Sequence, residues 1–244
     1  MTARGRYADG VVWPDPRPAA PRVLVCFSFC GGGTAPYRPW QHSVPDDVDL
    51  ALVCLPGRER RVAEPPALTW DDLRTEVLTS VRSVAGRPYV LFGHSMGAWV
   101  AFDTTVHMQQ SGRPPQALVV SASDVPGRPV RGAPTSRTPD EDLLAWLRTV
   151  GQLPDAIVED PVLRQMALDL FRADTRAAES YAYPSGTVVD CPLRLLQPDA
   201  DPDVDPDDDS WSRLTVGPYH MHRLPGGHFY SESVWAELPR HMGL

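Results

Sequence analysis

The pentapeptide Gly93-His94-Ser95-Met96-Gly97 constrains the fold more than any other feature of the chain. An apolar run (YVLF) precedes it, and a stretch of helical character (MGAWVAF) follows. A G-x-S-x-G sequence between a strand and a helix forms a sharp turn that exposes the serine hydroxyl, and glycines tolerate the crowding on either side. The N–H groups that begin the helix favour developing negative charge. The pattern predicts Ser95 as a nucleophile, the alternative being an ordinary tight turn.

Short apolar runs alternate with helical stretches along the chain. The runs lie at residues 22–28, 49–55, 88–93, 117–122, 192–197 and 219–224. Nearly continuous apolar character is typical of strands buried on both faces, as in a parallel sheet. Residues 70–85 carry apolar side chains at helical spacing, and residues 96–110 predict a second helix. The order predicts an α/β fold with a mostly parallel sheet.

Residues 138–183 break this rhythm. One helix is predicted to begin at Thr138-Pro139, and another to run from Asp160-Pro161 to about residue 178. Such a segment is long for a connector, so we expect a helical lid at about residues 131–187 inserted between two strands. With this insertion included, the chain fits one domain spanning residues 1–244.

A serine nucleophile needs a base, and in a triad with this motif the acid and the histidine follow the serine. His228 lies in a glycine-flanked loop directly after the last apolar run, where the base is expected. The other histidines are expected to be structural or exposed to solvent: His42, His94, His107, His220, His222 and His241.

Two positions can supply the acid that orients this histidine. Asp201 follows the penultimate apolar run and faces the histidine loop, so it is favoured. Asp124, after the run at 117–122, is the alternative, and Asp199 and Asp203 also stay open. The rest of the acidic stretch at 199–209 is read as a solvated loop, because its prolines forbid a helix or a central strand.

An oxyanion needs two backbone donors. The N–H of Met96, next to the nucleophile, is one candidate. The second is the N–H of Cys30, in the glycine-rich loop Phe29-Cys30-Gly31-Gly32-Gly33 after the first long apolar run. A nucleophilic Cys30 thiol is the alternative, although no second base is evident. The cysteine spacing fits neither a redox motif nor a zinc site, so no metal or cofactor is expected.

Composition limits the classes of partner. The net charge of −8 argues against a general nucleic-acid binder. No stretch approaches the roughly 18 apolar residues of a membrane span, and residues 1–20 lack the apolar run of a secretory signal. We therefore expect a cytoplasmic protein without nucleic-acid or membrane partners, and a monomer.

Taken together, these motifs resemble the type II thioesterases, the stand-alone editing enzymes of polyketide and nonribosomal peptide synthesis. The resemblance runs from about residue 22 to 229. It includes the turn at residues 93–97, which we call the elbow, together with Gly226-Gly227-His228-Phe229, Leu55-Pro56-Gly57-Arg58-Glu59-Arg60-Arg61 and Phe171-Arg172-Ala173-Asp174. It implies an α/β-hydrolase fold with a helical lid and a triad of Ser95, Asp201 and His228. It also implies hydrolysis of acyl groups from the phosphopantetheine arm of acyl or peptidyl carrier proteins.

The chain departs from the family pattern in three places. The family usually has Pro-His-Ala-Gly-Gly where this chain has Ser28-Phe29-Cys30-Gly31-Gly32, which alters the wall beside the oxyanion site. Ser121-Ala122-Ser123-Asp124 stands where the family usually has Ser-Gly-Arg-Arg. The acid loop at 199–209 is also unusually rich in aspartate, with seven of them.

The lid and the charges suggest where substrates bind. We expect an apolar acyl channel lined by Phe29, Leu143, Leu147, Leu163, Met166 and Phe171, unless the lid residues simply pack the lid onto the core. Carrier proteins are typically acidic, so the aspartate loop should repel them, and docking should use an arginine-bearing surface such as Arg58, Arg60 and Arg61. A small-molecule esterase, lactonase or acyltransferase with the same triad, or a non-catalytic carrier-binding protein, are the alternatives.

Overall fold

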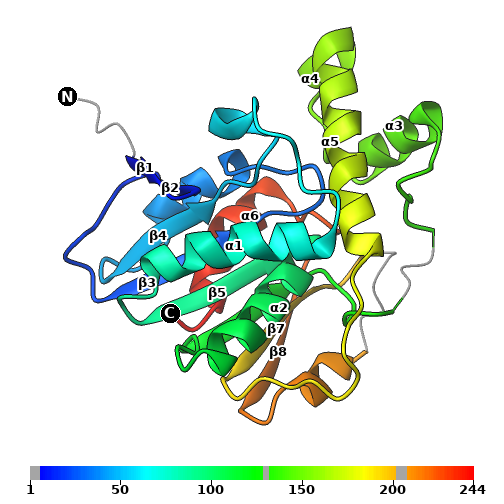
Figure 1. The fold of residues 1–244 in the computed structure, drawn as a ribbon. Helices are drawn as coiled ribbons and strands as arrows, with labels where there is room; N and C mark the ends of the chain where they lie inside the picture. Colours follow the sequence, from blue (N-terminus) through cyan, green and yellow to red (C-terminus); the bar gives the residue numbers. More distant parts are fainter. Residues whose placement is uncertain (1–5, 129–131, 202–207) are drawn as a thin grey trace.

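The computed structural model describes residues 6–128, 132–201 and 208–244. Within these residues the strands form one eight-stranded sheet in the order β1-β2-β4-β3-β5-β6-β7-β8 (Figure 1). The strands from β3 onward pair in parallel, whereas β1 and β2 are antiparallel. Their bounds are β1 Arg6–Ala8, β2 Val11–Trp13, β3 Arg22–Phe27, β4 Val48–Val53, β5 Tyr89–His94, β6 Ala117–Ser121, β7 Leu193–Pro198 and β8 Tyr219–Leu224.

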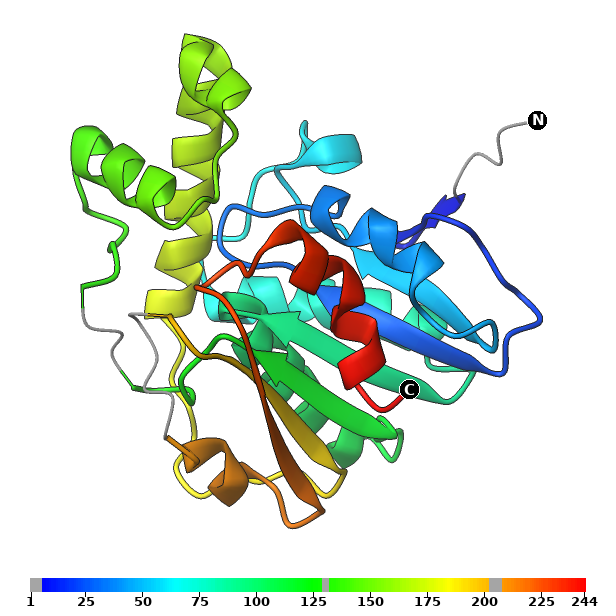
Figure 2. The ribbon, with the colours of Figure 1, turned by 180° about the vertical axis from the view of Figure 1, so that it is seen from behind.

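Helices cover both faces of the sheet. The α-helices are α1 Trp70–Val84, α2 Met96–Gln110, α3 Asp140–Thr149, α4 Asp155–Glu159, α5 Pro161–Glu179 and α6 Glu232–Glu237. Short 3-10 helices are η1 Ala35–His42, η2 Glu59–Arg61, η3 Ser210–Leu214 and η4 Leu238–His241. Helices α1 and α2 lie on the face seen in Figure 1, and α6 with η4 lies on the opposite face, seen in Figure 2. This arrangement confirms the predicted α/β fold.

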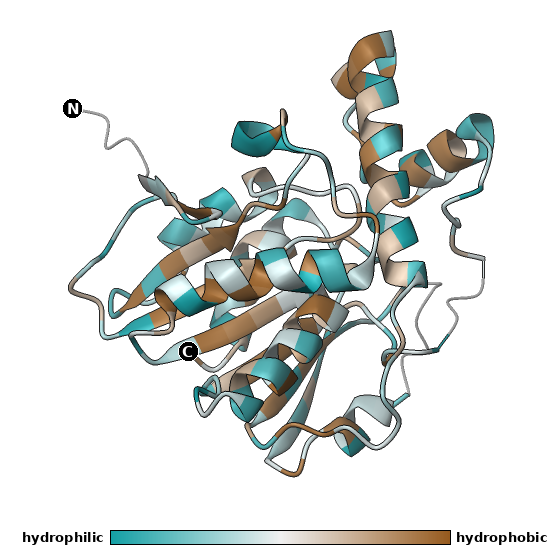
Figure 3. Cartoon of the chain, in the orientation of Figure 1, coloured by the Kyte–Doolittle hydropathy of each residue, from teal (hydrophilic) through white to brown (hydrophobic). Residues whose placement is uncertain are grey.

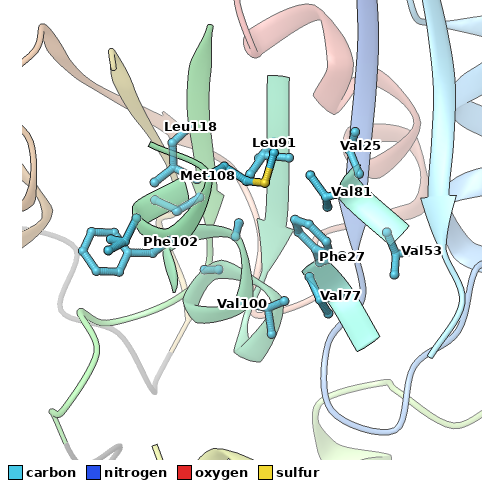
Figure 4. Packing of buried hydrophobic residues seen from close by; sticks show 14 of the residues in the cluster. Val25, Phe27, Val53, Val77, Val81, Leu91, Val100, Phe102, Met108 and Leu118 are labelled. Carbon is cyan, nitrogen blue, oxygen red and sulfur yellow. The ribbon is translucent and has the colours of Figure 1, made fainter. Parts of the chain in front are cut away.

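The alternation of side chains along each strand explains why both faces are covered. In β3, Val23, Val25 and Phe27 pack against α1 and α2, whereas Leu24 and Cys26 join the core on the other face. Figure 3 shows the hydrophobic colouring of the central strands, and Figure 4 shows Val77 and Val81 of α1 packed over Phe27 and Val25. Burial on both faces is what the continuous apolar runs predicted.

The helix signals of the sequence are also confirmed. Helix α1 buries the apolar positions expected of it, namely Leu73, Val77, Leu78, Val81 and Val84. Helix α5 begins at Pro161, as predicted, because the Asp160 carboxylate accepts the N–H groups of Val162 at 2.8 Å and Leu163 at 3.0 Å.

The hairpin of β1 and β2 was not predicted. Asp9 and Gly10 join the strands with φ values of 52° and 75°. An Asp-Gly pair with both residues in the left-handed region is typical of a tight hairpin turn. The signal was therefore present in the sequence, but the strands are only three residues each.

The predicted insertion is occupied by α3, α4 and α5, between β6 and β7. We call these helices and their connections the lid segment; Figures 1 and 2 show them grouped beyond one end of the sheet. The predicted first residue of the insertion, Arg131, lies outside the described residues. Among the residues that are described, no helix is long and apolar enough to cross a membrane.

Candidate active site

Ser95 occupies a strained turn between β5 and α2. Its φ of 56° and ψ of −124° lie outside the regions that L-residues favour. A Cβ at Gly93 would collide with the carbonyl of Gly97, and one at Gly97 would lie 2.5 Å from the Phe27 carbonyl oxygen. Both flanking positions therefore require glycine. Ser95 is the residue that precedes α2, so its side chain lies at the positive end of the helix dipole.

Asp201 and His228 meet at the ends of two neighbouring strands. The strands β7 and β8 pair in parallel, so the loops after their carboxyl ends lie at one edge of the sheet. The Asp201 Oδ2 atom lies 2.7 Å from His228 Nδ1, and the side chains are 0% and 9% exposed. This bond leaves Nε2 of the imidazole as the nitrogen able to accept a proton. His228 and Ser95 line the same cavity.

Asp124 takes a different place at this edge. Its carboxylate lies 3.5 Å from Arg128 Nη1, and its backbone carbonyl accepts the Trp99 indole N–H at 2.8 Å. Asp199 accepts the N–H of Gly226 at 2.9 Å and so holds the turn before His228. Asp203 lies outside the described residues. The structure therefore pairs the imidazole with Asp201.

The other histidines make structural contacts or are exposed to solvent, as His42 and His220 are. His94 is completely buried behind His228, with the ring centroids 5.3 Å apart, and burial holds the pKa of His94 well below its usual value. His107 bonds to the backbone carbonyl of Asp103 at 2.8 Å. His222 of β8 and His241 of η4 stack with their ring centroids 4.6 Å apart.

The two expected oxyanion donors border the cavity. Cys30 and Met96 both line it, with Cys30 Sγ 3.4 Å from Met96 Sδ. Burial raises the pKa of the Cys30 thiol far above its usual value, so the thiolate is disfavoured. The geometry suits a role for the Cys30 amide and not for its thiol.

The cavity has a volume of about 480 Å³ and lies between the elbow and the lid segment. Phe29 and Phe171 line it, as expected. The prediction was wrong for the other channel residues. Leu143 and Leu147 are 0% and 1% exposed because their helix face packs against α5, and Leu163 and Met166 are 46% and 48% exposed on the outside of α5.

Two aromatic residues that line the cavity, Trp99 and Tyr181, were not predicted from the sequence. Trp99 lies four positions after Ser95, so the helical period places it on the same side of α2 as the nucleophile, and the sequence could have shown this. Tyr181 follows α5 and stacks on Trp70 with ring centroids 4.0 Å apart. No local signal identifies Tyr181.

The predicted arginine surface also needs correction. The side chain of Arg58 is only 5% exposed and pairs with Asp174, so it cannot contact a partner. Arg61 is 12% exposed and pairs with Glu64 and Glu76. Arg60 alone of the three is exposed. Two of the three arginines in this motif, Arg58 and Arg61, therefore form ion pairs within the fold.

A strained serine before a helix, an Asp201–His228 pair after the last strands and a parallel sheet with a lid define a serine hydrolase of the α/β-hydrolase fold. Residues 22–240 match the thioesterase domain family, and the chain belongs to that family.

Two named relatives and one solved structure illustrate what this chain is similar to. Thioesterase PikA5 of Streptomyces venezuelae is 30% identical over 248 residues, covering 98% of this chain and 86% of PikA5. The gramicidin S biosynthesis protein GrsT of Aneurinibacillus migulanus is 28% identical over 214 residues, covering 87% of this chain and 84% of GrsT. Among solved structures, the type II thioesterase BorB from the borrelidin cluster superposes with a TM-score of 0.84 at 33% identity, covering 97% of this chain and 99% of BorB.

Proposed function

We propose that this enzyme hydrolyses acyl thioesters held on the phosphopantetheine arm of carrier proteins, with Ser95, His228 and Asp201 as its triad. The observation that carries the proposal is the 2.7 Å bond between Asp201 and His228 beside the strained Ser95, in one cavity under the lid segment. The relative named for gramicidin S biosynthesis and the type II thioesterase of the borrelidin cluster support a carrier-bound substrate.

The first half of the reaction forms an acyl-serine. His228 Nε2 accepts the Ser95 proton as the oxygen bonds to the thioester carbonyl carbon. The oxyanion is held by the N–H groups of Met96 and Cys30. The C–S bond then breaks, and the pantetheine sulfur leaves with the proton from His228. Asp201 stabilises the imidazolium in between, because it is fully buried against Nδ1.

The second half releases the acid. A water molecule gives a proton to His228 and attacks the acyl-serine carbonyl, and the oxyanion uses the same two donors. Collapse breaks the bond to Ser95, whose oxygen recovers the proton from His228. The products are the free acid and the thiol, with no cofactor consumed.

The cavity fits an acyl group in its apolar part. Phe29, Trp99 and Phe171 face the space above Ser95, and the volume of about 480 Å³ is within the range of small-ligand sites. A thioester of a carrier-bound acyl chain could place its carbonyl at the elbow and its chain between these rings.

The test compares substrates that carry one acyl group in different forms. The protein is incubated with acyl-loaded carrier proteins, with the same acyl group on a short pantetheine mimic, and with the corresponding simple ester. We expect kcat/KM to be highest for the carrier-bound thioester, and Ser95→Ala to abolish all turnover. Ser233→Ala, which changes an exposed serine, is the matched control and should keep full activity.

Two results would overturn the proposal. Equal turnover by Ser95→Ala would exclude the serine mechanism. A preference for the simple ester, with no gain from the carrier, would favour a small-molecule esterase, and transfer of the acyl group to an added alcohol or amine would favour an acyltransferase.

A further inference from the structure

One peptide of the glycine-rich loop at residues 29–33, which we call the oxyanion loop, is held on both sides by the lid segment. The Cys30 carbonyl accepts a hydrogen bond from Gln152 Nε2 at 2.6 Å. The next N–H, that of Gly31, donates to Asp174 Oδ2 at 2.8 Å. This carbonyl and this N–H belong to the same peptide unit, and their partners lie 122 and 143 positions away in the chain. Two lid side chains therefore fix the orientation of that peptide plane.

Asp174 is itself held rigidly. Arg58 Nη2 lies 2.6 Å from Asp174 Oδ1, and Arg58 Nη1 lies 2.9 Å from Oδ2. Arg58 Nη1 also donates to the Gly32 carbonyl at 2.6 Å. A buried arginine thus joins α5 to the oxyanion loop, since both side chains are about 5% exposed or less.

Close packing leaves the loop no freedom beneath the lid. Gly31 has a φ of 70°, and a Cβ there would lie 3.2 Å from Phe171 Cβ and 3.3 Å from Gln152 Nε2. The backbone of the loop contacts the lid segment directly, without an intervening side chain at Gly31.

The peptide on the other side of Cys30 is fixed within the loop. The Phe29 carbonyl accepts the N–H of Gly32 at 2.9 Å. Both peptide planes that flank Cys30 are therefore hydrogen-bonded, one by the loop and one by the lid. The Cys30 N–H lies in the first of these planes, and the two planes join at the Cys30 Cα, so the lid contacts on the second plane fix the position of the atom that carries this N–H group.

We infer that Gln152 is a positioning residue that orients the Cys30 N–H for the oxyanion, so that the seated lid completes the oxyanion site. The inference rests on the proposed function and adds to it a coupling between lid position and transition-state stabilisation. When the lid moves away, Gln152 and Asp174 leave the Cys30–Gly31 peptide, and the Cys30 Cα with its N–H group is then no longer held from the lid side. Hydrolysis is then restricted to the state in which the lid covers the acyl group.

The test replaces Gln152 by a side chain of similar size that cannot donate. Gln152→Met should lower kcat about 10- to 100-fold, below the 10²- to 10³-fold effect of deleting one oxyanion donor, because the amide is misoriented and not removed. KM for the acyl carrier should stay within about twofold, since ground-state binding does not use the oxyanion donors. Gln165→Met is the matched control, because Gln165 is exposed and donates to the exposed Asp169 of the same helix.

A second readout separates positioning from a general structural effect. An alkyl boronic acid forms a tetrahedral adduct with the serine, and its oxygen takes the place of the oxyanion. The inhibition constant of Gln152→Met should rise by the same factor by which kcat falls. Gln152→Asn, which keeps the amide but shortens its reach, should show the same two changes and serves as the second variant should Gln152→Met fold poorly.

Several results would overturn the inference. One is unchanged kcat in both Gln152 variants. Another is a fall in kcat without a matching rise in the boronate inhibition constant, which would mark a structural role. The proposed function fails separately: a wild-type protein that neither hydrolyses carrier thioesters nor binds the boronate would overturn that function, and this inference with it.

Discussion

Arg58 and Asp174 form a buried ion pair, with Arg58 Nη2 2.6 Å from Asp174 Oδ1, although 116 positions separate them in the chain. Arg58 comes from the loop after β4, and Asp174 lies in the middle of α5. The pair fastens the lid segment to the domain core at the point where the oxyanion loop passes. Two sequence motifs that look unrelated along the chain are therefore one structural unit.

Breaking the Arg58–Asp174 ion pair should lower the stability of the folded protein. Arg58→Met leaves the Asp174 carboxylate buried without its partner, and we expect unfolding free energy to fall by about 3–5 kcal/mol. Arg60→Met, at an exposed site in the same motif, should change it by less than about 0.5 kcal/mol. Urea unfolding measures both. The double variant Arg58→Met with Asp174→Leu should recover part of the loss, and equal stability of the two single arginine variants would contradict the prediction.

The acid of the triad can be assigned by comparing two conservative changes. Asp201→Asn removes the charge that stabilises the imidazolium and should lower kcat on the order of 10³- to 10⁴-fold. Asp124→Asn should lower kcat by less than about 10-fold, because His228 is paired with Asp201. Steady-state rates on one acyl carrier measure this, with circular dichroism to verify folding. Similar losses in both variants would show that the assignment is wrong.

The Cys30 thiol should be inert. Burial raises the pKa of the thiol groups of Cys26, Cys30, Cys54 and Cys191, so almost no thiolate exists near neutral pH. Iodoacetamide at pH 8 should leave the native protein active and Cys30 unmodified, as read by mass spectrometry of its peptide. The urea-unfolded protein is the positive control and should be alkylated. Rapid inactivation together with labelling of Cys30 would instead support a thiol mechanism.

The acyl-chain preference should respond to Phe171 and not to Met166. Phe171→Leu removes ring atoms from the cavity wall, so turnover should shift toward longer or bulkier acyl groups. Met166→Leu changes a residue that is 48% exposed outside the cavity and should leave the profile unchanged. Relative kcat/KM over a series of acyl chain lengths is the measurement. An identical profile in wild type and Phe171→Leu would mean that this ring only packs the lid.

The buried His94 should make stability depend on pH. Its pKa is far below the value of about 6.5 in an unfolded chain, so below pH 6.5 only the unfolded state binds this proton. Stability from this group is complete above about pH 6.5 and falls as the pH is lowered, by up to about 1.4 kcal/mol per pH unit. Urea unfolding between pH 7.5 and 5.5 measures the slope. The unfolding free energy of His94→Gln should depend less steeply on pH than that of the wild type. His42→Gln changes an exposed site and should keep the wild-type slope. Equal slopes in the wild type and both variants would contradict the prediction.

Much of the fold could be predicted from local patterns. The strands that carry the site were expected within one or two residues of their observed bounds, and the apolar spacing of α1 gave its buried face. The glycines around Ser95 were expected because a strand-to-helix turn leaves no room for a Cβ, and the clashes at Gly93 and Gly97 agree. These features depend on residues close together in the chain.

Predictions failed where the answer depended on packing between distant segments. Leu143 and Leu147 lie on an apolar helix face, and the sequence did not show whether that face meets the cavity or α5. Arg58 belongs to a run of arginines that suggested an exposed surface. In the structure it is buried and paired with Asp174. An apolar or charged pattern in the sequence shows which side chains share one face of an element, but not which segment of the fold packs against that face.

The sequence by itself determined the α/β architecture and the position of the strained serine, because strand period, helix period and turn sterics act over a few residues. Only the tertiary structure decided that Asp201 faces His228, and that Gln152 and Asp174 hold the peptide beside Cys30. Those contacts are made where separate loops meet at one edge of the sheet. Hydrogen bonds between residues more than a hundred positions apart produce no periodic pattern in the sequence from which they could be predicted.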